Sequence, residues 1–129
     1  PTSVSINDGL KLFNTYITAA LKCVPPEDKP SQQELNTCFS YFKNEIYLLK
    51  NLKIIVALGK IAFDACFKFY QDMYMLKKSN YLFKHGIKYK MPDNKYLVGC
   101  YHPSPRNVNT KRININKMVK LFKNVKSSI

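Results

Sequence analysis

The stretch Lys53–Leu76, KIIVALGKIAFDACFKFYQDMYML, decides the fold. Its opening residues, KIIVAL, are almost all apolar, which is typical of a short strand buried on both faces of a parallel sheet. Gly59 ends this run, and from Lys60 to Leu76 apolar residues recur at helical spacing. We therefore expect a strand, a tight turn and a helix in direct succession. The apolar stripe expected on this helix consists of Ile61, Ala62, Ala65, Phe69 and Met73.

The sequence on both sides of this stretch continues the alternation of strands and helices. Upstream, Thr15–Cys23 has the composition of a strand, and Ser31 to Glu34 (SQQE) form a capping box that predicts the start of a helix. Downstream, Tyr96–Tyr101 (YLVGCY) predicts a further strand that ends at His102-Pro103. A polar loop to about Asn114 then leads into a last amphipathic helix.

This alternation predicts an α/β fold with a mostly parallel sheet. In such sheets, ligands bind at the carboxyl ends of the strands. Cys23, Gly59 and His102 each follow the end of a predicted strand, so we expect them to line one rim of the sheet. The 129 residues show no division into two halves, and we treat residues 1–129 as a single domain.

The charge of the chain favours an anionic partner. Twenty-one Lys and Arg residues stand against eight Asp and Glu residues, which gives a net charge of +13. Such a surface suits nucleic acid first, and an anionic membrane surface or an RNA-rich complex next. A solvated basic face without a polyanionic partner is the alternative. No apolar run is long enough to span a bilayer and no targeting signal is visible, so we expect a cytoplasmic, prokaryotic protein.

Four cysteines, Cys23, Cys38, Cys66 and Cys100, occur without any CxxC pair. In the absence of a secretory signal, buried thiols or metal ligands are better expectations than a disulfide framework.

Four blocks of sequence, in a fixed order, resemble one family. They are Tyr16–Pro26 (YITAALKCVPP), Val56–Ala65 (VALGKIAFDA), His85-Gly86, and Gly99–Arg112 (GCYHPSPRNVNTKR). Together they resemble the iron–sulfur uracil-DNA glycosylases, most closely the type-b branch. The HPSPRN segment is the most specific part of the resemblance.

The resemblance implies a fold and a reaction. The fold is a three-layer α/β/α arrangement with a short four-stranded parallel sheet, of which this chain would supply about three strands, as the C-terminal portion of the domain. The reaction is excision of uracil, and of other deaminated bases in some relatives, from DNA: the base is flipped out of the duplex and its N-glycosidic bond is hydrolysed.

For the segment from His102 to Asn107, the resemblance implies contact with the flipped nucleotide. His102 would stabilise the negative charge that develops on the leaving base, because a hydrogen-bond donor placed near its carbonyl oxygen favours the transition state. Asn107 would act at the lesion, and Arg106 would enter the gap left by the base or grip its flanks. The residues expected to contact DNA are Ser104, Pro105, Arg106, Thr110, Arg112 and Lys60. A surface histidine in a proline-rich turn is the alternative interpretation.

Two further positions follow from the resemblance. His85 has either a role beside the base or a structural role at the end of a loop. Lys111 stands where the family often has Gly, which adds a positive charge and alters the turn.

In the family, cysteines spaced like Cys23 and Cys38 are two of the four ligands of a 4Fe-4S cluster. The resemblance therefore implies a structural cluster with two ligands in this chain. Cys66 and Cys100 are expected to be core residues.

The family's first motif, a Gly- and Pro-rich loop after an interior strand, has no counterpart in the sequence. We expect an N-terminal segment or a second polypeptide to supply it. A non-catalytic DNA-binding module or accessory subunit on the same fold is the alternative function. A generic nucleotide-binding domain is a weaker one, because the turn at Gly59-Lys60 matches neither GxGxxG nor the P-loop.

Overall fold

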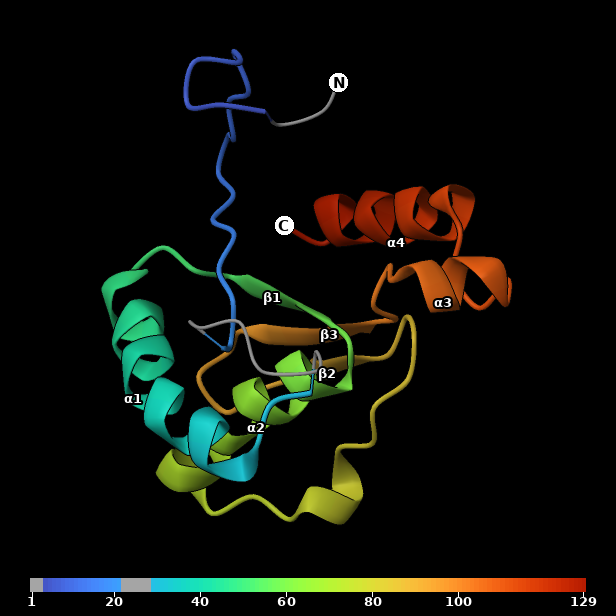
Figure 1. Cartoon of the computed structure of the whole chain (residues 1–129). Coiled ribbons are helices and arrows are strands. Elements are labelled where there is room, and N and C mark those ends of the chain that lie inside the picture. The colour runs from blue at the N-terminus through green and yellow to red at the C-terminus, as the bar shows by residue number, and fades with distance from the viewer. Residues whose placement is uncertain (1–3, 22–28) are drawn as a thin grey trace.

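The structure is a computed structural model that describes residues 4–21 and 29–129. Within these residues, three strands form one sheet in the order β1 (Ile54–Leu58), β3 (Tyr96–Cys100) and β2 (Lys88–Lys90) (Figure 1). Strands β1 and β3 are parallel, whereas β2 runs antiparallel to β3. The predicted α/β class is confirmed, and β2 departs from the expected parallel arrangement.

The strand, turn and helix expected around Gly59 are present. Strand β1 ends at Leu58, and α2 (Lys60–Tyr74) begins directly after Gly59. Because Leu58 pairs with Cys100 in register, β1 and β3 end at the same edge of the sheet. Strand β1 is less buried than predicted: Ala57 is buried, but the other residues are half-buried or exposed, since β1 is an edge strand in the described part of the chain.

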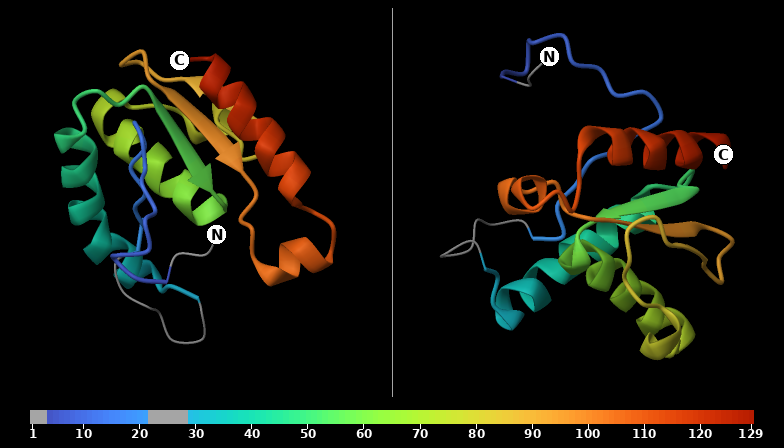
Figure 2. Two further views of the ribbon diagram at one scale, coloured as in Figure 1. Left: turned by 90° about the horizontal axis from the view of Figure 1, so that it is seen from above. Right: turned by 90° about the vertical axis from the view of Figure 1, so that its right-hand side faces the viewer.

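Helices cover both faces of the sheet, so the molecule has three layers (Figures 1 and 2). Helix α4 (Ile115–Ser127) lies on one face, and α1 (Gln32–Leu48) lies with α2 on the other. The core is divided in the same way. The buried residues on the α1 and α2 side are Phe42, Ile46, Ala57, Phe63, Cys66, Phe69, Tyr70, Met91 and Leu97. Those on the α4 side are Val98, Cys100, Ile113 and Leu121.

The buried surface of α2 differs from the predicted stripe. Phe67 and Tyr70 are buried, whereas Ile61 and Met73 are exposed. The helix packs against the sheet, against α1 and against the segment that follows it, where Tyr81 lies 5.2 Å from Phe67 between ring centroids. A helix that is buried on several sides carries apolar residues around much of its circumference. The spacing of its apolar residues then does not predict which side faces the sheet.

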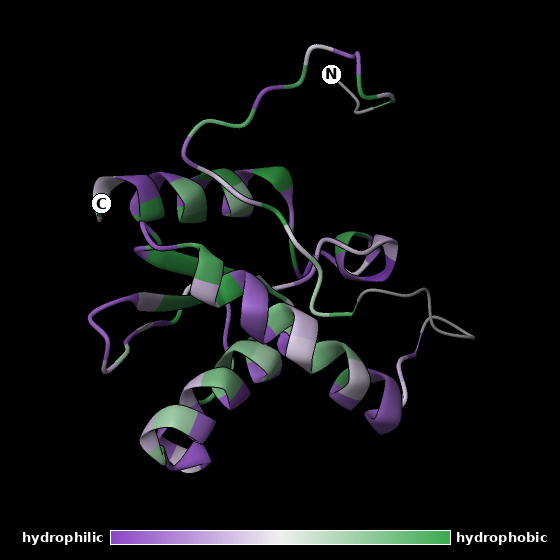
Figure 3. Cartoon of the chain, turned by 90° about the vertical axis from the view of Figure 1, so that its left-hand side faces the viewer, coloured by the Kyte–Doolittle hydropathy of each residue, from purple (hydrophilic) through white to green (hydrophobic). Residues whose placement is uncertain are grey.

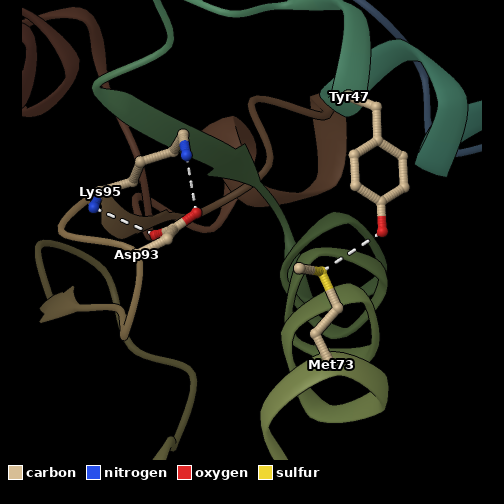
Figure 4. Close-up of polar contacts among 4 residues, drawn as sticks. All are labelled: Tyr47, Met73, Asp93 and Lys95. Atoms are coloured by element: carbon tan, nitrogen blue, oxygen red, sulfur yellow. Dashed lines mark hydrogen bonds and ion pairs between the residues drawn. The ribbon is translucent and has the colours of Figure 1, made fainter.

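The predicted capping box begins α1. The Ser31 hydroxyl oxygen accepts the backbone N–H of Glu34 at 3.2 Å, and the Glu34 carboxylate accepts the backbone N–H of Ser31 at 2.6 Å. At the other end of α1, the Tyr47 hydroxyl donates to Sδ of Met73 in α2 at 3.5 Å (Figure 4). The Tyr47 ring also meets Phe69 edge-on, with 5.4 Å between centroids. These contacts fix α1 against α2.

The basic segment between α2 and β3 contains the 3₁₀ helix η2 (Lys78–Asn80) as well as β2. In the turn that joins β2 to β3, Asp93 accepts hydrogen bonds from the backbone N–H of Lys95 at 3.1 Å and from its Nζ at 2.7 Å (Figure 4). The nearby Tyr70 hydroxyl is buried and has no hydrogen-bond partner among the described residues. Burial, and then the Asp93 carboxylate, raise the pKa of Tyr70.

The strand predicted at Thr15–Cys23 is wrong for residues 15–21, which run as extended chain without pairing to another strand (Figure 1). The rest of that range, including Cys23, lies outside the described residues. Hydroxyl groups of Tyr16 and Thr18 donate to the Glu45 carboxylate of α1 at 3.2 and 2.6 Å. A β-prone sequence forms a strand only where a neighbouring strand is available.

Apolar side chains of this N-terminal segment face solvent: Phe13 is 79% exposed and Ile17 is 71% exposed. Hydrophobic and hydrophilic residues also alternate along α4, the helix beside the C label in Figure 3. Among the described residues, no helix has both the length and the apolar character needed to cross a membrane.

Candidate nucleic-acid interface

The carboxyl ends of β1 and β3 form the rim on which the site is built. The backbone N–H of Gly59, directly after β1, donates to the carbonyl of Cys100, the last residue of β3, at 2.7 Å. The chain leaving β1 and the chain leaving β3 are therefore joined at the rim. The prediction that Gly59 and His102 share one rim is confirmed, whereas Cys23 lies outside the described residues.

Gly59 allows His102 to lie against the start of α2. Its φ of 98° is in the range that favours glycine, and a Cβ atom at this position would lie 3.1 Å from Cβ of His102. The imidazole side of His102 is nevertheless exposed. One edge of the His102 side chain thus lies close to Gly59, while the residue as a whole remains exposed.

The segment that follows His102 contains a short helix that the sequence interpretation missed. Helix α3 spans Pro105–Asn109, and the Ser104 hydroxyl oxygen caps it by accepting the backbone N–H of Asn107 at 3.3 Å. A Ser at the N-cap followed by Pro at the first helical position is a recognised signal for a helix start. The loop expected here is therefore partly helical.

Asn107 connects α3 back to the candidate catalytic residue. Its side-chain amide donates to the carbonyl of His102 at 2.7 Å. The half-buried Asn107 therefore holds the backbone of His102, while the neighbouring Arg106 is exposed. Of these two predicted residues, Asn107 contacts His102 directly, and Arg106 lies on the exposed surface of α3.

The chain after α3 closes into a compact turn. The Thr110 hydroxyl donates to the carbonyl of Arg106 at 2.8 Å, and the backbone N–H of Arg112 donates to the carbonyl of Asn107 at 2.9 Å. Lys111 adopts a left-handed conformation with φ of 58°. The turn that a Gly would favour is thus kept with Lys at this position.

Two of the predicted DNA contacts already have partners within the chain. The guanidinium of Arg112 lies over the ring of Tyr101, 5.4 Å from its centroid. Lys60, at the first position of α2, forms an ion pair with Asp64 one turn later. Both cations lie beside the rim and keep part of their surface exposed.

His85 lies on the other side of Tyr101. Its Nδ1 atom accepts the backbone N–H of Tyr101 at 3.2 Å, and the two rings are 5.2 Å apart between centroids. The side chain is half-buried, and burial, followed by the charge of Lys117, lowers its pKa. This contact could be found only from the three-dimensional arrangement.

Positive charge is concentrated in the last part of the chain. From Asn94 onward there are eight Lys and Arg residues and no Asp or Glu residue. This part includes α3 and α4, so the part of the rim formed by α3 and the face of the sheet covered by α4 carry positive charge with no carboxylate side chain from this stretch. Phosphate groups are the anions that such a surface binds without regard to sequence.

The cysteines divide into two groups. Cys66 and Cys100 are buried in the two halves of the core, and burial raises the pKa of Cys66 to about 12 and also raises that of Cys100. Cys38 is buried as well but belongs to neither core cluster. Among residues 4–21 and 29–129, no three metal-binding side chains come together.

A cavity of about 260 Å³ lies at the other end of the parallel strands. Its lining includes Lys53, which precedes β1, and the Asp93–Lys95 turn, which precedes β3. The cavity is therefore separated from the rim by the length of the sheet and is not part of this site.

Comparison with known proteins adds an independent finding. The family model described as Uracil DNA glycosylase superfamily matches residues 4–126. The chain is 38% identical over 106 residues to the type-5 uracil-DNA glycosylase of Thermus thermophilus, covering 82% of this chain and 47% of that protein. It is 33% identical over 123 residues to the type-5 enzyme of Pyrobaculum aerophilum, covering 95% and 51%. With the Mycobacterium leprae type-5 enzyme the identity is 32% over 127 residues, covering 98% and 54%. The chain spans about half the length of these curated relatives.

Proposed function

Because the chain belongs to the uracil DNA glycosylase superfamily, we propose that it carries the DNA-binding side of an enzyme that excises uracil from DNA in base excision repair. The reaction is hydrolysis of the N-glycosidic bond of a nucleotide flipped out of the duplex. The observation that carries the proposal is the placement of His102: Asn107 holds its backbone carbonyl, its side chain lies close to Gly59, and the residue is exposed at the rim.

His102 would act as the electrophilic contact. As the bond to the sugar breaks, negative charge develops on the carbonyl oxygens of the leaving base. An imidazole N–H in a fixed position stabilises this charge without having to be reorganised during the reaction. Asn107 holds the His102 backbone and Gly59 lies close to its side chain, and both restrict the imidazole as this role requires.

The surrounding residues would hold the DNA backbone. The Ser104 hydroxyl accepts a hydrogen bond within α3 and can still donate its proton to a phosphate oxygen. Arg106 follows in α3, and it is exposed, as are Lys60, Thr110 and Arg112. Pro105 fixes the first turn of α3. In the described conformation Asn107 is engaged with His102, so its contact with a lesion would require exchange of this bond.

We also propose, as part of this function, that Cys23 and Cys38 are two ligands of a 4Fe-4S cluster of the iron–sulfur, type-b branch. The cluster would be structural. Support comes from the exclusion of the other thiols: Cys66 and Cys100 are packed in the apolar core with raised pKa values, which disfavours the thiolate that binds iron. The two remaining ligands would come from outside this chain.

A further segment, from the same protein or a second polypeptide, would complete the enzyme. Strand β1 offers an outer edge that pairs with no strand among the described residues. Apolar side chains that a neighbouring segment could cover are exposed on α4, where Ile115 is 79% exposed, and in the N-terminal segment. The segment would supply the interior strand and the loop that holds uracil, and with it the choice between uracil and other deaminated bases.

The test is excision by the complete protein carrying this chain. We expect His102→Ala to lower single-turnover excision of uracil by roughly 10²–10³-fold, the usual cost of one lost donor to a developing oxyanion. Affinity for the same duplex, measured with a non-hydrolysable uracil analogue, should change little. A variant at an exposed residue beyond the far end of α2, Lys77→Ala, serves as the matched control. Undiminished excision by His102→Ala would contradict the proposal.

One observation favours a non-catalytic DNA-binding module as a second candidate. The described residues of the rim are 58–64, 84–86 and 100–112. Among them, Asp64 has the one side-chain carboxylate, and it forms an ion pair with Lys60. These residues therefore offer no unpaired carboxylate to activate water. Binding of uracil-containing duplex by the complete protein, with no cleavage after prolonged incubation, would favour this candidate.

A further inference from the structure

The backbone that leads into His102 is held by a side chain. Tyr101 is the first residue after β3, and its N–H donates to Nδ1 of His85 at 3.2 Å. The two rings also lie in contact, with centroids 5.2 Å apart. Because Tyr101 directly precedes His102, the position of the His85 ring determines where the chain leaves the sheet.

The loop that carries His85 has a fixed position. The backbone N–H of Gly86 donates to the carbonyl of Gly99 at 2.8 Å, and the N–H of Gly99 donates to the carbonyl of Ile87 at 2.9 Å. A Cβ atom at Gly99 would lie 2.5 Å from the carbonyl oxygen of Lys84, so only glycine lets the loop approach so closely. His85 is thus anchored on both sides by backbone contacts to β3.

The hydrogen bond also determines the protonation state of His85. Nδ1 can accept the Tyr101 N–H only when it carries no proton, so the ring is neutral with its proton on Nε2. The charged groups around it are positive: Lys117 reaches it from α4, Arg112 lies over the Tyr101 ring, and Lys84 precedes it in the chain. The pKa of His85 is lowered, first by burial and then by Lys117.

We infer that His85 is a positioning residue, a neutral imidazole that sets the place of His102 by holding the Tyr101 amide and releases it when protonated. Protonation puts hydrogen on Nδ1, so two donors then face each other and the bond is lost. The role of His85 in excision rests on the proposed function, but the hydrogen bond itself can be tested without substrate.

Three substitutions separate the acceptor from the ring. His85→Asn places a carbonyl oxygen close to the position of Nδ1 and does not titrate. His85→Gln carries the same group one bond farther out, and His85→Phe keeps the ring contact with Tyr101 but has no acceptor. We expect His85→Phe and His85→Gln to lower kcat for excision by about 10- to 100-fold, as a misplaced reactive group does, with little change in KM. His85→Asn should retain most of the activity.

The pH dependence of kcat adds a measurement that would not change if His85 had a purely structural role. In the complete protein, kcat should fall on the acid side as His85 is protonated, and His85→Asn should shift or remove this fall. Full kcat in His85→Phe, or an unchanged acid limb in His85→Asn, would overturn the inference.

Nuclear magnetic resonance of this chain tests the bond directly. We expect ¹⁵N shifts of His85 to report a proton on Nε2 at neutral pH, and the Tyr101 amide shift to move as His85 titrates. A proton on Nδ1 would overturn the inference even if excision is observed. If the bond is present but the complete protein excises nothing, the proposed function fails and the positioning contact stands.

Discussion

Gly59 and His102 lie so close together at the rim that a Cβ atom at position 59 would be 3.1 Å from Cβ of His102. Gly59 also has a φ of 98°. A substitution here has two costs: backbone strain in a region that side chains avoid, and displacement of His102.

We predict that Gly59→Ala lowers the free energy of unfolding by about 1–3 kcal/mol through backbone strain, and lowers excision further by moving His102. Gly86→Ala is the matched control for stability, because Gly86 has a φ of 80° but nothing within 4 Å of its added Cβ. Denaturant unfolding of both variants measures the difference. Equal losses would mean that the contact with His102 contributes nothing to stability.

Lys111 holds a left-handed conformation, φ 58°, that costs a residue with a side chain about 1–2 kcal/mol. We predict that Lys111→Gly raises the free energy of unfolding by up to about 1 kcal/mol, because the relief of strain exceeds the added entropy of the unfolded chain. Lys111→Ala keeps the strain and removes the same charge. Both variants should bind DNA equally weakly at a given salt concentration, and a stability gain in Lys111→Ala would point to the charge as its cause.

The buried Tyr70 hydroxyl has no hydrogen-bond partner among the described residues. We predict that Tyr70→Phe leaves the free energy of unfolding unchanged or raises it by about 1 kcal/mol, because an unsatisfied buried hydroxyl is removed. Tyr89→Phe is the comparison, since the Tyr89 hydroxyl donates to the carbonyl of Leu82 at 2.9 Å and its loss should destabilise by about 1 kcal/mol. Destabilisation by both substitutions would show that Tyr70 makes a hydrogen bond, with the Asp93 carboxylate, which raises the pKa of Tyr70, as the candidate acceptor.

The cluster proposal predicts different outcomes at two buried cysteines. In the complete protein, Cys38→Ala should remove the broad visible absorbance of a thiolate-bound cluster and lower the bound iron, because one ligand is lost. Cys66→Ala should keep both and lose only a little stability, since Cys66 is a core thiol with a pKa raised to about 12 by burial. The same iron content in wild type and Cys38→Ala would exclude Cys38 as a ligand.

Local signals were sufficient for the centre of the fold. The apolar run before Gly59 and the helical spacing after it predict β1 and α2, and the SQQE capping box predicts the start of α1 at Ser31. That Gly59 and His102 share a rim follows from parallel pairing alone, because both follow strands that run in the same direction.

The other parts of the fold and of the site depend mainly on contacts between residues that are distant in sequence. Residues 15–21 have strand-forming side chains but no neighbouring strand among the described residues, and so remain extended chain. Strand β2 is a three-residue edge strand with Lys at both ends, too short and too polar to give a pattern. Helix α3 did have a signal, Ser104 followed by Pro105, but a helix of five residues carries no periodicity. The contact between His85 and Tyr101 has no sequence signal at all.

If the proposed function holds, the concentration of positive charge after Asn94 affects how a lesion would be found. A field that is stronger on one side of a protein orients it during approach, so that DNA meets the rim and α4 before the rest of the molecule. Contacts made mainly to phosphate have nearly the same energy at every base pair, and a protein held by them can slide along a duplex. The lysines of α4 would then contribute less to holding one site than to scanning many, and the search should slow sharply at high salt.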